Sequence, residues 1–364
     1  MELSELRPLF AGPGPWASVY LDATRAEENA AHQIDLRWRA LADRLATDGA
    51  DPATVDAIGT AIHEHPYRPG RYGLAIFAAG GNVALAEPLP APPPADLAVW
   101  EPLPHLMPMI AQRGEEIPYV RVAAGHAGGD VSAIDADGVP RRREVAGGET
   151  FPLRKVHAGG WSHLRYLHAV EETWKRNAGD VAAAAAELAG RIGAEVILVA
   201  GDPHEVPLVV ERLPARWRER VVTANLTGGS EHLDDVTVQA IAEVADQHAR
   251  AAIERYGEGP AAGGLSDVVT RLQRGQADTV LLIDDPSSTD RLWIGLDDFS
   301  LVAAEPDLLR QSGVEDPVEV RADAALLRAI AGTGADLVLV APGEAELPHG
   351  IGAILRYRDG QSAA

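Results

Sequence analysis

The stretch Arg154-Lys155-Val156-His157-Ala158-Gly159-Gly160-Trp161-Ser162-His163-Leu164-Arg165-Tyr166, here called the Gly-Gly-Trp segment, decides how the middle of this chain is interpreted. Its two glycines permit backbone shapes that other residues rarely reach and leave amide groups open to close approach. Ser162 can cap a following helix. The basic residues around Trp161 favour RNA as a partner, through phosphate contacts and stacking of the indole on a base. The alternative is a plain strand-to-helix connection whose Trp161 folds back onto its own domain.

The sequence on both sides of this segment predicts a sheet with one long helix. After it, an apolar residue recurs every three or four positions, which is typical of an amphipathic helix. This stripe consists of Leu164, Leu167, Val170, Trp174, Ala178, Val181, Ala185, Leu188 and Ile192. Residues 195–200 form a continuous apolar run, as in a buried strand. Before the segment, residues 119–124 and 131–134 resemble paired strands, and a polar loop is expected from the turn at Asp137-Gly138 to Gly159.

Composition separates the chain of 364 residues into three segments. We expect three small α/β domains: an N-terminal domain over 1–117, a middle domain over 118–233 and a C-terminal domain over 234–364. The middle domain should hold a mixed sheet and the long helix after the Gly-Gly loop. In the C-terminal segment, helices and strands alternate in a pattern that indicates an α/β sandwich.

The expected elements outside the middle segment are few and clear. In the N-terminal segment, strands are predicted at 19–21 and 72–77, a helix at 30–46, and irregular structure in the proline-rich run 88–94. In the C-terminal segment, helices are predicted at 234–256 and 265–274, and strands at 279–284 and 336–341.

Composition also excludes several classes of protein. The chain contains no cysteine, which removes disulfides, thiolate nucleophiles and cysteine-based zinc sites. The N-terminus carries acids where a signal peptide would carry basic residues, and no apolar run approaches the ~20 residues of a membrane-spanning helix. The formal net charge of −22 opposes indiscriminate binding to nucleic acid. We therefore expect a cytoplasmic protein that binds neither membrane nor DNA.

Positive charge is nevertheless concentrated in one window of the chain. Between Arg141 and Arg176 lie three consecutive arginines, the Gly-Gly-Trp segment and both lysines, Lys155 and Lys175. The acids of the same window are Glu144, Glu149, Glu171 and Glu172. Such a patch on an acidic body indicates one specific anionic contact. The alternative is a solvated face stabilised by ion pairs within helices.

Most catalytic signatures are missing. The sequence has no Walker loop, no GxSxG elbow and no HExxH motif. His63-Glu64-His65 resembles a metal motif, but zinc sites need a third protein ligand in place. Asp284-Asp285 follows a predicted buried strand, where α/β enzymes place carboxylates, although turns use the same residues more often. We therefore predict no catalytic residue, no metal and no cofactor.

Several motifs resemble the release factors of the archaeo-eukaryotic type, a family that includes Pelota. Their middle domain carries the loop Lys-His-x-x-Gly-Gly-Gln-Ser-x-x-Arg-Phe before a long helix. Here the similar residues are Lys155, His157, Gly159, Gly160, Ser162, Arg165 and Tyr166, with the histidine displaced by one position. Residues 196–201, 278–282 and 349–357 resemble further family elements in the right order. The pattern Gly-Gly-Trp-Ser is similar to the bacterial branch, which includes Balon-like ribosome hibernation factors.

The resemblance implies a ribosomal role without chemistry. In true release factors the loop enters the peptidyl transferase centre, where a glutamine helps to position the hydrolytic water. Trp161 stands at that place here, and an indole has one donor and no acceptor. The Asn-Ile-Lys-Ser stop-codon motif is also missing. The implied protein mimics tRNA and occupies the A site of idle or stalled ribosomes.

The resemblance also assigns contacts. His157, Gly159, Gly160, Trp161 and Ser162 would lie in the peptidyl transferase centre, whereas Arg154, Lys155 and Arg165 would contact ribosomal RNA. The C-terminal domain of the family engages a translational GTPase, which in bacteria points to elongation factor Tu. Two alternatives stay open: a rescue factor that hydrolyses peptidyl-tRNA with the amides of Gly160 and Trp161, and a non-ribosomal nuclease or regulator on the same scaffold.

Overall fold

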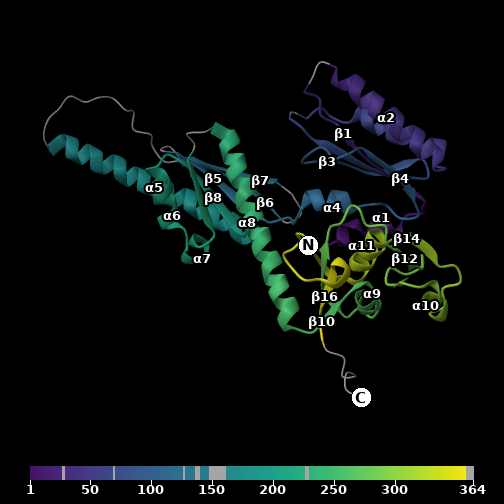
Figure 1. Ribbon diagram of the computed structural model, residues 1–364. Helices are drawn as coiled ribbons and strands as arrows, with labels where there is room; N and C mark the ends of the chain where they lie inside the picture. The colour runs from purple at the N-terminus through teal and green to yellow at the C-terminus, as the bar shows by residue number, and fades with distance from the viewer. Residues whose placement is uncertain are drawn as a thin grey trace. The chain divides into compact units, whose positions relative to one another are not determined.

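The computed structural model describes residues 1–26, 29–68, 70–125, 128–135, 140–146, 161–225 and 229–357. The chain divides into two compact units: unit 1 is Met1–Gly114 with Ala249–Ala364, and unit 2 is Glu115–His248. Figure 1 labels the helices and strands along the chain. The described residues form four sheets accompanied by helices, which confirms the expected α/β class. The division into three domains stays a prediction.

Unit 2 is built on a five-stranded mixed sheet with the order β7-β6-β5-β8-β9. Strands β6 and β7 pair antiparallel, as do β5 and β6, whereas β8 runs parallel to both β5 and β9. The elements are β5 (Tyr119–Gly125), β6 (Gly128–Ile134), β7 (Pro140–Ala146), α5 (Trp161–Ile192), β8 (Val196–Gly201), α6 (Glu205–Arg212), α7 (Ala215–Arg218) and β9 (Val221–Asn225). The mixed sheet and its long helix are as expected.

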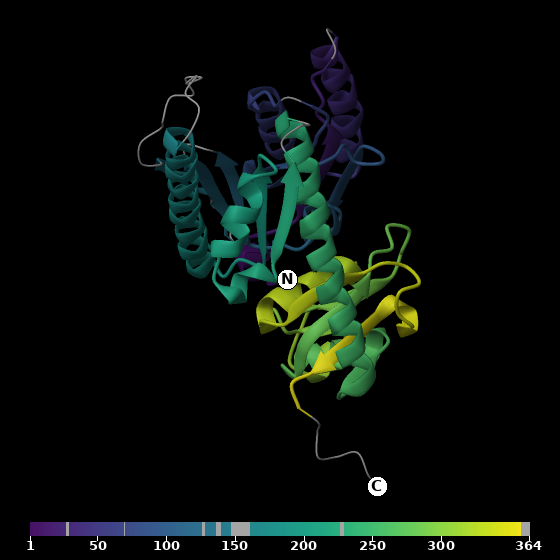
Figure 2. The same cartoon turned by 90° about the vertical axis from the view of Figure 1, so that its left-hand side faces the viewer.

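Both faces of this sheet are covered, as the side chains that alternate between the two faces along β8 show. Ile197 and Val199 belong to one apolar cluster with Val181 and Leu188 of α5. Leu198 lies in a second cluster, on the side of α8 (Gly229–Glu258). Successive side chains of a strand point to opposite faces, so a strand covered on both sides reads as a continuous apolar run. Figure 2 shows α5 running along the sheet.

One prediction for unit 2 is wrong. The region after Asp137-Gly138 was expected to be a loop as far as Gly159, but residues Pro140–Ala146 form strand β7. Three consecutive arginines hide the alternation that marks a strand. They are tolerated because β7 is the edge strand of its sheet, where charged side chains stay in contact with water and discourage pairing with other chains.

The N-terminal part of unit 1 is an antiparallel sheet with the order β3-β2-β1-β4. Its elements are η1 (Ser4–Leu6), α1 (Arg7–Ala11), β1 (Trp16–Asp22), α2 (Ala30–Thr47), α3 (Pro52–Glu64), β2 (Gly73–Ala79), β3 (Asn82–Leu89), β4 (Leu97–Glu101) and α4 (Met107–Arg113). Helices α2 and α3 bury Ile34, Leu45 and Ile58 on one face of the sheet. The proline-rich run is irregular only in part, since edge strand β3 continues through Pro88 to Leu89.

The C-terminal part of unit 1 contains two further sheets, with the orders β10-β16-β11-β15 and β13-β12-β14. The elements are β10 (Ala261–Gly263), α9 (Leu265–Gln273), β11 (Ala277–Ile283), β12 (Arg291–Ile294), β13 (Val302–Ala303), α10 (Pro306–Gln311), β14 (Val318–Arg321), α11 (Ala322–Thr333), β15 (Asp336–Val340), η3 (Pro348–Gly350) and β16 (Ile351–Leu355). Strands β11 and β15 are parallel, and β16 is antiparallel to β11. The start of β16 therefore lies at the carboxyl end of β11.

A shared core joins the two parts of unit 1. Tyr20 and Phe77 of the N-terminal sheet belong to one apolar cluster with Leu327 and Ile330 of α11. Helix α11 is buried along nearly its whole length, and its Arg328 is only 1% exposed. No helix among the described residues is both long and apolar enough to cross a membrane.

Candidate functional site

In the sequence, the Gly-Gly-Trp segment follows β7 and runs into the start of α5. Arg154, Lys155, His157, Gly159 and Gly160 fall outside the described residues. Helix α5 begins at Trp161, and its first turns carry Trp161, Ser162 and Arg165. Ser162, which was expected to cap the helix, is therefore a residue of the helix itself. The two glycines therefore immediately precede the long helix in the sequence.

The second half of α5 is anchored to the sheet of unit 2. Ala178, Val181, Ala185 and Leu188 are all at most 6% exposed and pack in the core of the unit. The approach is close, because a β-carbon added to Gly129 would lie 3.1 Å from Val181 and 2.8 Å from the Ala123 carbonyl oxygen. This packing fixes the second half of the helix that follows the two glycines to the sheet of unit 2.

The three consecutive arginines on β7 are paired with acids. Arg141 donates to Asp135 at 2.9 Å, Arg142 donates to Asp130, and Arg143 donates to Glu187 of α5 at 2.6 Å. The hydrogen bond from Arg143 lowers the pKa of the Glu187 carboxyl. All three acids lie outside the window considered in the sequence. These arginines are therefore held in ion pairs, although on a strand and not within a helix as the alternative expected. Whether Arg154, Lys155 and Arg165 are paired stays a prediction.

His248 joins the first and last residues of unit 2. Its Nδ1 lies 3.0 Å from Glu115, and its Nε2 lies 2.9 Å from Glu195, just before β8. Burial alone would lower the pKa of His248, but the hydrogen bonds and charges of the two carboxylates outweigh it and raise that pKa. With both ring nitrogens donating, the protonated imidazolium is the form that satisfies both acids.

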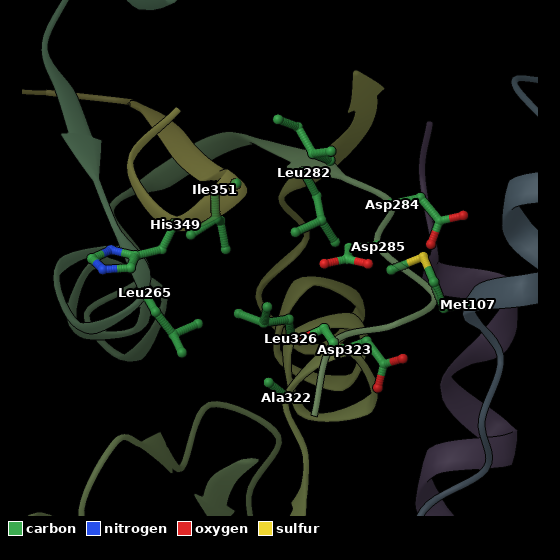
Figure 3. A pocket seen from close by; sticks show the side chains of 13 residues that line it. Met107, Leu265, Leu282, Asp284, Asp285, Ala322, Asp323, Leu326, His349 and Ile351 are labelled. Carbon is green, nitrogen blue, oxygen red and sulfur yellow. The ribbon is translucent and has the colours of Figure 1, made fainter. Parts of the chain in front are cut away.

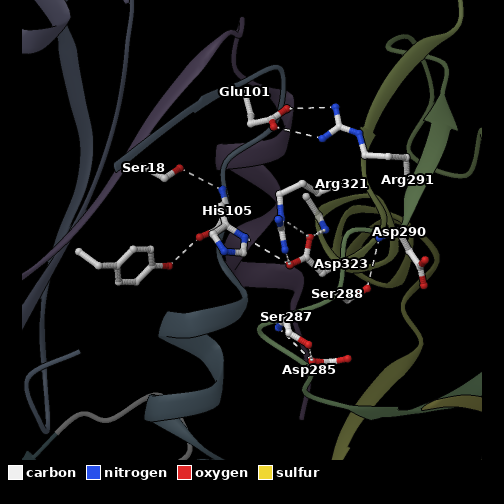
Figure 4. A network of polar contacts seen from close by, with 12 residues as sticks. Ser18, Glu101, His105, Asp285, Ser287, Ser288, Asp290, Arg291, Arg321 and Asp323 are labelled. Carbon is white, nitrogen blue, oxygen red and sulfur yellow. Dashed lines mark hydrogen bonds and ion pairs between the residues drawn. The ribbon is translucent and has the colours of Figure 1, made fainter. Parts of the chain in front are cut away.

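In unit 1, a partly buried polar network centres on Asp323 (Figure 4). Arg321 donates two hydrogen bonds to its carboxylate at 3.1 and 3.0 Å, and His105 Nδ1 lies 3.3 Å from the same group. Burial opposes ionisation of Asp323, but the hydrogen bonds from His105 and Arg321 outweigh it and hold its pKa well below the ordinary value. The His105 backbone is fixed as well: its amide donates to Ser18 at 3.0 Å, and its carbonyl accepts from Tyr20 at 2.6 Å.

The paired aspartates after β11 separate into two roles. Asp285 is exposed and accepts hydrogen bonds from the amide and hydroxyl of Ser287, so it forms the turn expected for this pair. Asp284 is half-buried and lines a cavity of about 200 Å³ at the carboxyl end of β11. Burial raises the pKa of the Asp284 carboxyl, and the nearby Asp323 adds to the effect. Figure 3 shows Asp284 and Asp323 on the Met107 side of this cavity, with His349 on the opposite side.

Of the two histidines in the metal-like motif, His63 makes polar contacts with neighbouring protein groups. His63 Nδ1 lies 2.6 Å from the Gly59 carbonyl oxygen, and its Nε2 lies 3.1 Å from Asp35. Burial lowers the pKa of His65. Within the part of the chain that the structure describes, no three histidines or carboxylates are grouped to hold a metal ion.

The network around Asp323 was not predicted from the sequence. His105 and Asp323 are far apart along the chain, and each stands alone in an apolar or loop context. The only local signal is Arg321-Ala322-Asp323 at the start of α11, which is an ordinary arrangement at a helix N-terminus. A contact of this range becomes visible only when the sheets are assembled.

Comparison with known proteins finds a family model that is similar to part of the chain. Residues 118–262 match the model of "Bacterial archaeo-eukaryotic release factor family 2". "Uncharacterized protein Rv2629" of Mycobacterium tuberculosis (strain ATCC 25618 / H37Rv) is 29% identical over 372 residues, covering 98% of this chain and 97% of the relative. "Uncharacterized protein MT2704" of Mycobacterium tuberculosis (strain CDC 1551 / Oshkosh) gives the same values.

Solved structures with similarity along most of the chain include Archaeoglobus fulgidus Pelota, at 13% identity and a TM-score of 0.38, with 98% of this chain and 92% of that chain covered. The archaeal translation termination factor aRF1 is 16% identical, with a TM-score of 0.25 and coverages of 98% and 96%. The match to the model of bacterial archaeo-eukaryotic release factor family 2 includes the Gly-Gly-Trp segment.

Proposed function

We propose that this chain is a ribosome-binding, tRNA-mimicking factor that occupies the A site of idle or stalled ribosomes. The observation that carries the proposal is the family match over residues 118–262. These residues contain the Gly-Gly-Trp segment, whose two glycines directly precede α5. The family is named for release factors, and these act on ribosomes. The segment would enter the peptidyl transferase centre, with Arg154, Lys155 and Arg165 on ribosomal RNA and Trp161 stacked on a base.

The charge distribution supports this assignment. The net charge of −22 has the same sign as the charge of tRNA, and a local basic segment can still contact ribosomal RNA. The arginines of β7 are paired with acids of unit 2. We therefore assign the RNA contact to the basic residues of the Gly-Gly-Trp segment.

Silencing rather than hydrolysis is the second part of the proposal. Catalysis of peptide release needs a group that positions water, and the indole of Trp161 offers one donor and no acceptor. The bulk of this side chain would also fill the space that the water needs. The protein would therefore protect or silence the ribosome without cleaving peptidyl-tRNA.

Co-sedimentation with bacterial ribosomes tests the binding. The full chain should pellet with ribosomes, and the double variant Arg154→Glu, Lys155→Glu should bind about tenfold more weakly, with a shallower dependence on salt. The matched control is Arg141→Glu, Arg142→Glu, which makes the same charge change on paired residues. Loss of binding in the control alone would contradict the proposal. So would a full chain that binds neither ribosomes from growing cells nor ribosomes from starved cells.

A peptide-release assay separates silencing from rescue. Ribosomes that carry peptidyl-tRNA should retain the peptide in the presence of the full chain. Release that disappears in Gly160→Ala would instead establish the rescue function through backbone amides.

Elongation factor Tu is the proposed partner of the C-terminal segment 234–364. This assignment rests on the resemblance to the Balon-like branch of the family. A pull-down with purified elongation factor Tu tests it, and a ribosome complex that forms equally well without this factor would remove it from the proposal.

A further inference from the structure

A second cavity in unit 1 adjoins the one in Figure 3. The two cavities share Met107, Asp284 and Asp323 among their lining residues. The second has a volume of about 400 Å³, and we call it the proline cavity because Pro93, Pro94, Pro108 and Pro286 line it. It lies outside the Gly-Gly-Trp segment, so a ligand bound in it would be independent of the proposed function.

The wall of the proline cavity is largely apolar. Besides the prolines it includes Leu97, Met107 and Ala111. Ligand cavities in proteins commonly combine such walls with a few polar groups that fix the orientation of the ligand. An aliphatic chain fits walls of this kind, and the polar groups then decide what the chain must carry.

Asp284 is a polar group of this cavity that no described residue pairs with. It is half-buried, and in the described part of the chain it has neither a hydrogen-bond nor an ion-pair partner. The other carboxylates around it are occupied: Asp323 by Arg321 and His105, Asp285 by Ser287, and Asp96 by Arg37 at 3.4 Å. A carboxylate that leaves water without a partner loses free energy that an incoming cation can restore.

Gln112 offers a second open acceptor. Its Oε1 atom is buried, and no described residue donates a hydrogen bond to it. Gln112 lines the proline cavity together with Asp284. Two acceptors without donors call for a ligand that brings only donors, and ammonium and guanidinium groups have this property.

We propose that the proline cavity binds an alkylguanidinium or alkylammonium group, with the aliphatic stem against the prolines and Met107 and the cation on Asp284 and Gln112. The carrier is either the arginine or lysine side chain of a protein segment, or a free organic cation of the same chemistry. Both sources present the same aliphatic stem and the same donors, so they would make the same contacts in the cavity. The experiment below distinguishes the two sources.

The binding should depend on pH through Asp284. Burial and the negative charges of Asp323 and Asp285 raise the pKa of its carboxyl, and the positive charge of His105 opposes them. Since only the ionised carboxylate attracts a cation, binding should weaken as the pH falls through this raised pKa. In Asp284→Asn the pH dependence should disappear.

Isothermal titration of the full chain with n-butylguanidinium tests the site. We expect saturable binding that weakens about tenfold in Asp284→Asn, as befits the loss of one charge-assisted hydrogen bond. Gln112→Leu should weaken binding by a smaller factor. Asp285→Asn, next to the site but satisfied by Ser287, should bind like the unmodified chain, and neutral 1-pentanol should not compete.

A second titration identifies the carrier. A capped Gly-Arg-Gly peptide that binds at least as tightly as n-butylguanidinium assigns the cavity to a protein side chain, whereas a peptide that binds more weakly assigns it to a free organic cation. The proposal is overturned if neither probe binds, or if binding is the same in Asp284→Asn as in the unmodified chain. Hydrogen exchange on each variant shows that unit 1 remains folded.

Discussion

Unit 1 and unit 2 are held together by different kinds of contact. In unit 2, α5 rests on the sheet through small apolar side chains such as Ala178, Val181 and Ala185. In unit 1, polar side chains join residues far apart in the sequence: Arg291 donates to Glu101 across 190 positions, and Tyr20 donates to the His105 carbonyl across 85. Unit 2 thus supports its long helix by apolar packing and has a titratable contact, His248, at its ends, whereas unit 1 adds polar contacts between distant residues to its shared apolar core.

The largest expected effect is in the apolar core of unit 2. Ile197 on central strand β8 is fully buried, so Ile197→Ala should destabilise unit 2 by about 3 to 4 kcal/mol through lost burial and the cavity left behind. Hydrogen exchange followed by mass spectrometry should show faster exchange in peptides of 115–248. Unchanged exchange there would contradict the described packing. Ile192→Ala, at a partly buried position, is the matched control and should have a smaller effect.

A buried charge in unit 1 should come next. Arg328 is 1% exposed, donates to the carbonyls of Gly295 and Leu296 at 2.9 and 3.0 Å, and lies 5.0 Å from the ring centroid of Phe299. Arg328→Ala leaves these carbonyls unpaired, so unit 1 should lose about 3 kcal/mol. Urea unfolding and hydrogen exchange measure the loss. The exposed Arg310, paired with Asp307, is the control, and an equal loss in Arg310→Ala would refute the special role of Arg328.

The Asp323 network should give a smaller effect with a defined pH dependence. Asp323→Asn should cost about 2 kcal/mol, because charge-assisted hydrogen bonds are replaced by neutral ones. The pKa of Asp323 is depressed in the folded state, so its contribution is complete above the ordinary aspartate pKa of about 3.9 and is lost as the pH falls below it. Urea unfolding between pH 2 and 7 measures this, and the difference between the unmodified chain and Asp323→Asn should shrink toward low pH.

The smallest effect is expected at His248, and its stabilising contribution should depend on pH in the opposite direction to that of Asp323. The pKa of His248 is raised, so its stabilising contribution is complete below the ordinary histidine pKa of about 6.5 and is lost as the pH rises through the raised value. The imidazole is partly exposed, and solvent screening keeps the contribution below about 1 kcal/mol. His248→Ala should remove this pH dependence, as seen by hydrogen exchange of unit 2, whereas His204→Ala should not.

The contrast between the two units also explains which elements could be predicted from the sequence. The long helix and the strands of unit 2 follow from local periodicity, and α5 ends at Ile192 as its apolar stripe indicates. Strand β7 was missed because its three consecutive arginines hide the alternation of apolar and polar residues. At the edge of the sheet these arginines form ion pairs instead of being buried. In unit 1, α11 was missed as an element, since a helix buried all round shows no amphipathic pattern.

The candidate sites divide in the same way. The Gly-Gly-Trp segment is contiguous, so motif spacing alone could single it out. The proline cavity is assembled from residues near positions 20, 95, 110, 285 and 323, which only the paired sheets bring together. Asp284 was noted for following a strand, but its lack of a partner depends on how its neighbours are occupied.

Cryo-electron microscopy of ribosomes purified with this protein from starved cells tests the central claim most directly. We predict density in the A site, with the 157–162 segment near the peptidyl transferase centre and Trp161 beside a base. An empty A site, or this protein bound at a different position on the ribosome, would contradict the proposed function.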